Sequence, residues 1–171
     1  PKIRVLGIDR DLSAIGRARE RLQPFQGRVI FAHGSLENLR DLAAQSGVSK
    51  INGLLLDFGV SSPQLDTPER GFSIRNNGPL DMRMDKSQTT TAAHLLEKLK
   101  DMELISIIKN FGEERFAKKI VRAIRREQEE RPVVTTSHLA EIISRVVRSP
   151  RHSRIHPATR TFQALRIAVN N

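Results

Sequence analysis

The first part of the chain alternates between short apolar runs and stretches with helical spacing, and this order restricts the fold more than any other feature. Ile3–Ile8, Val29–Ala32 and Ile51–Asp57 have the length and apolar content of buried strands. Residues 12–22 and 36–46, which lie between these runs, repeat apolar side chains every three or four positions, as amphipathic helices do. Strands and helices alternating at this spacing predict an α/β fold built on a parallel sheet.

Polar side chains follow each predicted strand. Asp9 ends the first run, His33–Ser35 follows the second, and Asp57 ends the third. Ligands bind at the carboxyl ends of strands in parallel sheets, where a carboxylate accepts two hydrogen bonds from the vicinal hydroxyls of a ribose. Asp9 fits this role, although a single acid at a strand end also suits the cap of the next helix.

The glycine-rich loop that cradles phosphates in dinucleotide-binding folds does not occur in this sequence. Two explanations are open at this point. Either the nucleoside cofactor has no phosphates to hold, or the chain begins downstream of that loop. The presence of Pro1 where a native start would be Met favours the second explanation.

A second candidate site directly follows the third apolar run. Asp57 is followed closely by Ser61, Ser62, Pro63 and Gln64, which together offer a carboxylate, two hydroxyls, a proline carbonyl and an amide. Such a group can accept hydrogen bonds from an exocyclic amine and hold it against an electrophile. A sulfonium methyl donor needs little more from a protein than alignment and desolvation. The alternative is an ordinary Ser/Pro turn after a strand.

The second half of the chain is predicted to be helical. Residues 58–87 lack a sustained period but mix apolar side chains with turn residues, which is typical of an ordered functional loop. These patterns predict a sheet domain over residues 1–87, an inserted helical domain over 88–150, and a return to the sheet domain over 151–171. The helical patterns cover residues 91–99, 101–110, 113–130, 136–148 and 158–170.

The positive charge is concentrated in one region. The chain has 29 Lys+Arg and 19 Asp+Glu, a net charge of +10. Between Arg115 and Arg160 there are 12 basic and 4 acidic residues, which gives +8. This region is either a footprint for a phosphate backbone or a solvated helical face. Because the 7 Phe are the only aromatic residues, base stacking is expected to be a minor part of any such contact.

Several classes of protein are excluded by composition and pattern. The absence of Cys excludes disulfides, thiolate zinc sites and cysteine catalysis. No metal site is predicted. His152 and His156 are four residues apart, but Pro150 and Pro157 bracket them and disfavour the helix that would bring them together. Asp81 and Asp85 lie on either side of Arg83, which suggests an internal ion-pair network. No apolar run approaches the ~20 residues that span a bilayer, and the first residues given lack the apolar core of a signal peptide, so a cytoplasmic protein is predicted.

Six segments taken in order resemble the motifs of one family, the bacterial 16S rRNA cytosine-N4 methyltransferases (RsmH/MraW). The resemblance runs from end to end of the 171 residues. It implies a class I S-adenosylmethionine-dependent methyltransferase fold, a Rossmann-like parallel sheet with an inserted small helical domain. The segments are Gly7–Asp11, Leu55–Asp66, Pro68–Ser73, Gly78–Asp85, Gly112–Ala117 and His156–Ile167.

The resemblance also implies an activity and assigns site residues. The implied reaction is S-adenosylmethionine-dependent methylation of the N4 of a cytidine in the decoding region of 16S rRNA, in the small ribosomal subunit. Asp9 matches the acid that binds the cofactor ribose, Asp57 and Gln64 match two further cofactor contacts, and Leu36 matches a position near the adenine. In the predicted catalytic group, Asp57, Ser61, Ser62 and Pro63 orient the amine that accepts the methyl group.

The basic region is assigned to RNA on this interpretation. Two other functions are weighed against the methyltransferase: a non-enzymatic rRNA-binding module, and a fragment of a nicotinamide-dependent Rossmann dehydrogenase, for which Asp9 is equally suitable. The predicted RNA-binding residues are Arg115, Lys118, Lys119, Arg122, Arg125, Arg126 and Arg160.

The family's glycine-rich first motif would lie before Pro1, and the later strands of its sheet would lie after Asn171. The sequence therefore resembles an internal fragment of the enzyme. We expect the isolated chain to bind S-adenosylmethionine weakly or not at all, since the loop that holds the methionine part of the cofactor is missing. Isothermal titration calorimetry measures this directly, and micromolar binding would contradict the expectation.

Overall fold

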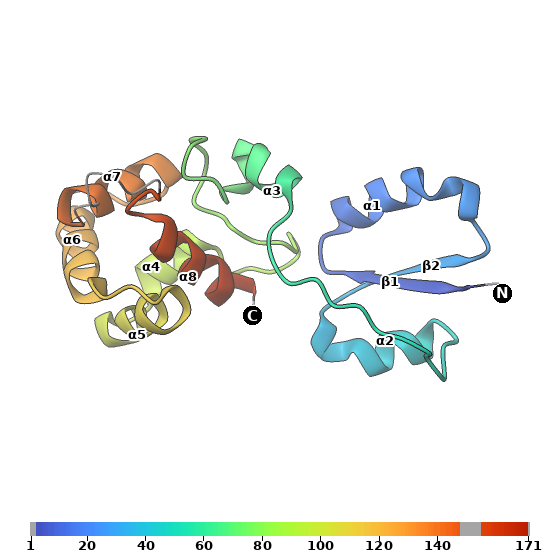
Figure 1. Cartoon of the computed structure of the whole chain (residues 1–171). Helices are drawn as coiled ribbons and strands as arrows, with labels where there is room; N and C mark the ends of the chain where they lie inside the picture. The colour runs from blue at the N-terminus through green and yellow to red at the C-terminus, as the bar shows by residue number, and fades with distance from the viewer. Residues whose placement is uncertain (1–2, 148–154, 171) are drawn as a thin grey trace. The chain divides into compact units, whose positions relative to one another are not determined.

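The computed structural model describes residues 3–147 and 155–170, and the chain divides into two compact units. Residues 1–58 and 84–87 form the first, which we call the strand unit. Residues 59–83 and 88–171 form the second, which we call the helical unit. Both are drawn in Figure 1.

The strand unit contains the predicted parallel pair of strands. Strands β1 (Val5–Asp9) and β2 (Val29–His33) pair in parallel, with Asp9 opposite His33. Helix α1 (Leu12–Arg21) and the 3₁₀ turn η1 (Gln23–Phe25) connect them, and η2 (Leu36–Asn38) and α2 (Leu39–Gln45) follow β2. Figure 1 shows α1 and α2 on opposite sides of the strands. This strand, helix, strand, helix order confirms the α/β prediction for the first 46 residues.

The third predicted strand does not form. Residues 51–57 have no strand partner, and the side chains of Ile51, Leu54 and Leu55 are exposed, Leu55 to 93%. An apolar run becomes a strand only when a neighbouring strand satisfies its backbone N–H and C=O groups. In the part of the chain that the structure describes, β1 and β2 pair only with each other.

The helical unit has a continuous apolar core. Leu96, Leu104, Ile120, Leu139 and Phe162 are all fully buried within it, and they come from five different helices. Its helices are α3 (Ser62–Asp66), α4 (Ala92–Lys98), α5 (Asp101–Gly112), α6 (Ala117–Glu130), α7 (Thr136–Val146) and α8 (Thr159–Asn170), with a 3₁₀ turn η3 (Pro68–Arg70) after α3.

One predicted helix start is wrong by a few residues. Helix α6 begins at Ala117 rather than near Glu113, because Glu113 adopts a left-handed conformation (φ 51°) that ends α5. Helix α7 begins at Thr136, the first residue of the predicted range, and is capped by Thr135, whose side chain accepts a hydrogen bond from the His138 N–H. The predicted end of this helix near Arg148, and the pair that includes His152, fall outside the described residues.

The described helices include none that is long and apolar enough to cross a membrane. Helix α8 lies against α4 and α5, and its Phe162 and Leu165 belong to the core of the helical unit. The predicted division of the chain at residues 88 and 151 stays a prediction.

Helices α5 and α8 meet closely at a glycine. A Cβ atom at Gly112 would lie 2.4 Å from the carbonyl oxygen of Arg160 and 3.1 Å from the Ala164 Cβ. Only a residue without a side chain allows this approach, since the obstacle is backbone. Gly16 in α1 has no heavy atom within 4 Å of such a Cβ, and it therefore serves as a control.

We predict that Gly112→Ala destabilises the helical unit by about 1–3 kcal/mol, because α8 must move away from α5. Gly16→Ala removes a glycine from an open helix position and is expected to stabilise α1 by up to about 1 kcal/mol. Thermal unfolding followed by circular dichroism compares the two variants with the parent chain. Equal melting temperatures for Gly112→Ala and the parent would contradict the proposed close contact.

Candidate functional site

Asp9 lies exposed at the carboxyl end of β1. Its Oδ1 accepts a hydrogen bond of 2.7 Å from the backbone N–H of Asp11. The cap of helix α1 is provided by Asp11, which accepts a 3.0 Å bond from the Ser13 N–H. Asp9 is thus oriented by the turn but is not the helix cap, and among the described residues no side chain binds its carboxylate. It is free to accept hydrogen bonds from a ligand.

The turns that follow β1 and β2 are linked by hydrogen bonds. The Arg10 guanidinium donates to the Ser35 hydroxyl at 2.9 Å, and the His33 Nε2 lies 3.0 Å from the Arg10 carbonyl oxygen. Since a carbonyl only accepts, this geometry requires the proton of His33 to be on Nε2. Leu36 begins η2 directly after this linked pair and is half-buried, so it can offer an apolar wall beside the strand ends.

Asp85 joins the strand unit from a distant part of the sequence. One of its carboxylate oxygens lies 3.6 Å from the His33 Nε2, and the other accepts a 2.8 Å bond from the Ser87 N–H. Hydrogen bonds from the Ser87 hydroxyl and N–H lower the pKa of Asp85, with smaller contributions from the charges of His33 and Arg10. The sequence placed Asp85 in an ion-pair network around Arg83, and its position beside β2 was missed because periodicity gives no information on such distant pairs.

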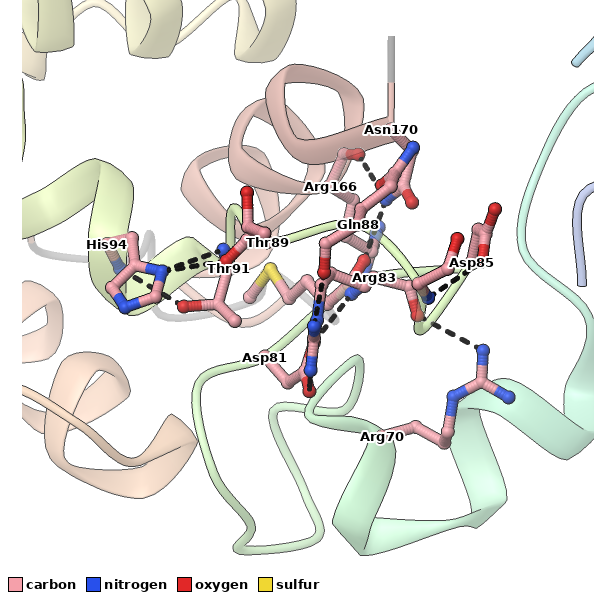
Figure 2. A network of polar contacts seen from close by, with 12 residues as sticks. Arg70, Asp81, Arg83, Asp85, Gln88, Thr89, Thr91, His94, Arg166 and Asn170 are labelled. Atoms are coloured by element: carbon pink, nitrogen blue, oxygen red, sulfur yellow. Dashed lines mark hydrogen bonds and ion pairs between the residues drawn. The ribbon is translucent and has the colours of Figure 1, made fainter.

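Figure 2 shows the polar network around Arg83, which includes residues before and after Asp85 and residues of α8. The predicted pairing of Arg83 with Asp81 is confirmed: Nε and Nη2 bind the two carboxylate oxygens at 2.7 and 2.8 Å, while Nη1 donates to the Gln88 carbonyl. Asn170 of α8 donates to the carbonyl of Met82 at 2.7 Å. Met82 is fully buried and has a φ of 64°, which is unusual for a residue with a side chain.

Two arginines attach the same loop to the rest of the helical unit. Arg70 donates to the Arg83 carbonyl at 3.1 Å (Figure 2). Arg166 of α8 donates to the Phe72 carbonyl, earlier in the same loop, at 3.2 Å. Burial lowers the pKa of Arg166. The backbone at Met82 is therefore held from several sides, which is what an unfavourable φ requires in order to persist.

The second candidate site is divided between the two units. Asp57 is exposed and belongs to the strand unit, whereas Ser61–Gln64 belong to the helical unit. Gln64 is buried, and its Oε1 accepts a 3.0 Å bond from the N–H of Ser61, the residue that caps α3. Ser61, Ser62 and Pro63 are exposed, and the Pro63 carbonyl accepts a 2.7 Å bond from the Thr67 hydroxyl. Within the helical unit, this motif is a capped helix start.

The predicted RNA-binding residues fall into two groups. The first group is exposed on α6 and just before it, and comprises Arg115, Lys118, Lys119, Arg122 and Arg126; Arg160 of α8 is also exposed and donates to the Glu113 carbonyl at 3.2 Å.

Arg125 is the exception. Its guanidinium donates to the carbonyls of Leu96 and Leu99 at the end of α4, and it pairs with Asp101 at 2.7 Å and with Gln128 at 2.8 Å. This side chain holds the α4–α5 connection.

Glu127 is the acidic centre of the surface between α6 and α7. It accepts bonds from His138 at 2.7 Å, Arg131 at 2.9 Å and Arg145 at 3.3 Å. The bond from His138 and then that from Arg131 lower the pKa of Glu127. No group of three or more potential metal ligands is present among residues 3–147 and 155–170.

Comparison with known proteins gives a consistent result. A family model described as the MraW methylase family matches residues 1–171. Ribosomal RNA small subunit methyltransferase H of Trichlorobacter lovleyi is 53% identical over 97% of this chain and 53% of its own length. Proteins of the same name from Geobacter sp. (strain M21) and Thermobifida fusca are 48% and 45% identical, over 99% and 100% of this chain and 55% and 52% of their own lengths. The chain thus spans about half the length of the curated relatives it matches.

We predict that the pKa of Asp85, measured by NMR titration of its carboxyl carbon, lies below the ordinary value of about 3.9. Ser87→Ala removes the hydroxyl bond and is expected to raise the pKa toward that value. A folded-state pKa below the unfolded one means that Asp85 stabilises the fold above the unfolded pKa and loses this effect as the pH falls through the folded pKa. An identical titration in the Ser87→Ala variant would contradict the assigned cause.

Proposed function

The chain belongs to the MraW methylase family, and on that premise we propose that the protein transfers a methyl group from S-adenosylmethionine to ribosomal RNA. The proposed target is the N4 amine of a cytidine in the decoding region of 16S rRNA in the small ribosomal subunit. Support for the coarser part, methylation of ribosomal RNA, comes from relatives named ribosomal RNA small subunit methyltransferase H, which match nearly all of the chain.

The observation that most supports the proposal is the carboxylate at the end of β1. Asp9 is exposed, and its Oδ1 accepts a hydrogen bond from the Asp11 N–H. The N-cap of α1 is Asp11, so Asp9 is not needed for that role. An oriented carboxylate at this edge suits the two hydroxyls of a ribose. Leu36, half-buried at the start of η2 after β2, suits the adenine as an apolar wall. These residues fit the nucleoside part of the cofactor.

Asp57 and the residues that follow it are proposed to position the amine that accepts the methyl group. S-adenosylmethionine, when bound, supplies an electrophilic sulfonium methyl group. The Asp57 carboxylate accepts a hydrogen bond from the cytidine N4 and aligns its lone pair, while Ser61, Ser62 and Pro63 provide further acceptors. Gln64 is also proposed to contact the cofactor; in the helical unit its Oε1 fixes the N–H of Ser61. Alignment of this kind removes most of the entropic part of the barrier.

The basic residues of the helical unit are proposed to bind the RNA. The same surface is compatible with a second function, a non-enzymatic rRNA-binding module, because binding of phosphates requires only the cations. The presence or absence of methyl transfer separates these two functions. The dehydrogenase alternative has no support in the comparisons, since the family matched over the whole chain is a methylase family.

We expect Asp57→Ala in the intact protein to reduce methylation by at least about 100-fold, because the amine loses its aligned acceptor. RNA affinity is expected to stay within about twofold, since Asp57 carries no positive charge that binds phosphate. Transfer of labelled methyl groups from S-adenosylmethionine into small ribosomal subunits measures the rate, and nucleoside analysis identifies N4-methylcytidine.

Asp66→Ala is the matched control, since Asp66 is an exposed acid at the end of α3 in the same motif. It is expected to methylate at close to the parent rate. Parent-like turnover by Asp57→Ala would reject the role given to Asp57, and the appearance of a different methylated nucleoside would reject the target.

A further inference from the structure

Helix α6 has an exposed face on which cations follow one another without an acid. Residues 115–126 contain six basic and no acidic side chains. Five of them are exposed. The spacing of the four within α6 places them on the side opposite its buried residues, and the fifth, Arg115, lies just before the helix. We call these five residues the α6 basic face: Arg115, Lys118, Lys119, Arg122 and Arg126.

The cations of the α6 basic face have no acidic partners among the residues that the structure describes. Elsewhere in the helical unit, some exposed cations do have them. Arg131 and Arg145 both bind Glu127, and Lys98 binds Glu97 at 2.8 Å. Arg125, which lies next to the face on the same helix, pairs with Asp101 and donates a hydrogen bond to the Leu96 carbonyl of α4. Arg75, Lys100, Lys109 and Arg160 are also exposed without an acidic partner among the described residues, but they lie far apart in the sequence, whereas the α6 basic face has five such cations within twelve residues.

This arrangement does not stabilise the helix itself. Lys118 and Arg122, like Arg122 and Arg126, are four residues apart, and like charges at this spacing repel. Acids in place of some of them would relieve the repulsion, as Glu127 does for the arginines around it. A favourable contact is made with Phe116, whose ring lies 4.7 Å from the Arg115 guanidinium and 5.6 Å from the Lys119 ammonium. An external anion is the partner that this face lacks.

The length of the face fits several phosphates of one strand. Lys118 and Arg126 are eight residues apart in α6, so this part of the face extends about 12 Å at about 1.5 Å per residue, and Arg115 lies before the helix. A stacked strand places one phosphate about every 3.4 Å along its axis, which gives about three to four phosphates over this length. The positive end of the helix dipole lies beside Arg115, and the acids Glu129 and Glu130 mark the opposite end.

We propose that the α6 basic face binds the sugar-phosphate backbone of a single-stranded segment of RNA. The proposal rests on the proposed function for the form of the RNA, because a cytidine N4 that accepts a methyl group cannot be engaged in Watson–Crick pairing. The face is a single file of cations along one helix, which suits one strand. The opposite side of α6 is fully buried through Ile120, Val121 and Ile124, so this helix has no apolar side to insert into a lipid surface.

The test measures RNA affinity as a function of salt. In the intact protein, Lys119→Gln, Arg122→Gln and Arg126→Gln are combined and compared with a control that combines Lys98→Gln, Arg131→Gln and Arg145→Gln. Both variants lose three exposed positive charges from the helical unit, but the control residues are ion-paired. The probe is a labelled single-stranded oligoribonucleotide of about 12 nucleotides, and thermal unfolding confirms that both variants fold.

Each phosphate contact contributes about −0.7 to the slope of log K against log salt for a single strand. The α6 variant is therefore expected to flatten this slope by about 2, whereas the control flattens it by much less. Equal slopes for the two variants would overturn the proposal. The proposal would also be overturned if the parent protein bound an RNA duplex of the same length more tightly than the single strand. The same holds if the α6 variant lost as much affinity for phosphatidylserine vesicles as for the single strand.

A methylation assay on the same proteins separates this inference from the proposed function. If the parent protein transfers no methyl group to rRNA but the slopes differ as expected, the proposed reaction fails and the RNA-binding face stands. If methylation proceeds and the slopes are equal, the reaction stands and the face is overturned.

Discussion

The helical unit depends on the close packing of α8 against α5. At Gly112 the two helices approach so closely that a single added carbon atom would collide with the α8 backbone. This contact brings Phe162 and Leu165 into the same core as residues from α4 to α7. From that position α8 also reaches the loop that precedes α4, because Asn170 binds the Met82 carbonyl. The last helix of the chain thus fixes a loop that comes almost ninety residues earlier.

Local patterns predicted much of this fold. Helix α1, strands β1 and β2, and helix α4 follow from patterns of neighbouring residues, and all are present close to the predicted ranges. The segment 51–57 fails for a non-local reason: its apolar content is suitable for a strand, but strand formation needs a hydrogen-bonded neighbour, and no local pattern reveals whether one is available. Glu113 shows a similar limit, since its left-handed backbone is set by the meeting of α5 and α6 and not by its own preference.

The number of cations in a segment does not show which of them are available to a ligand. Counting cations placed the excess correctly between Arg115 and Arg160, but counting does not distinguish a cation with a partner from one without. Arg125 and Arg126 are neighbours with opposite surroundings: the first is bound to the end of α4, and the second is exposed. In the candidate site, Asp9 was correctly placed at a strand end, while Asp85 could not be found because its partner His33 is distant in sequence.

The pairing of Asp85 with His33 has a consequence for the order in which the chain folds. The β1–β2 pair joins residues 24 positions apart, such as Asp9 and His33, whereas the pair of His33 and Asp85 joins residues 52 positions apart. Closing a loop costs entropy that grows with its length, so we expect the segment 84–87 to join the strand unit after β1 and β2 have paired. The strand unit is thus built from two separate pieces of chain. A contiguous stretch such as residues 1–58, made alone, would lack the carboxylate that neighbours His33.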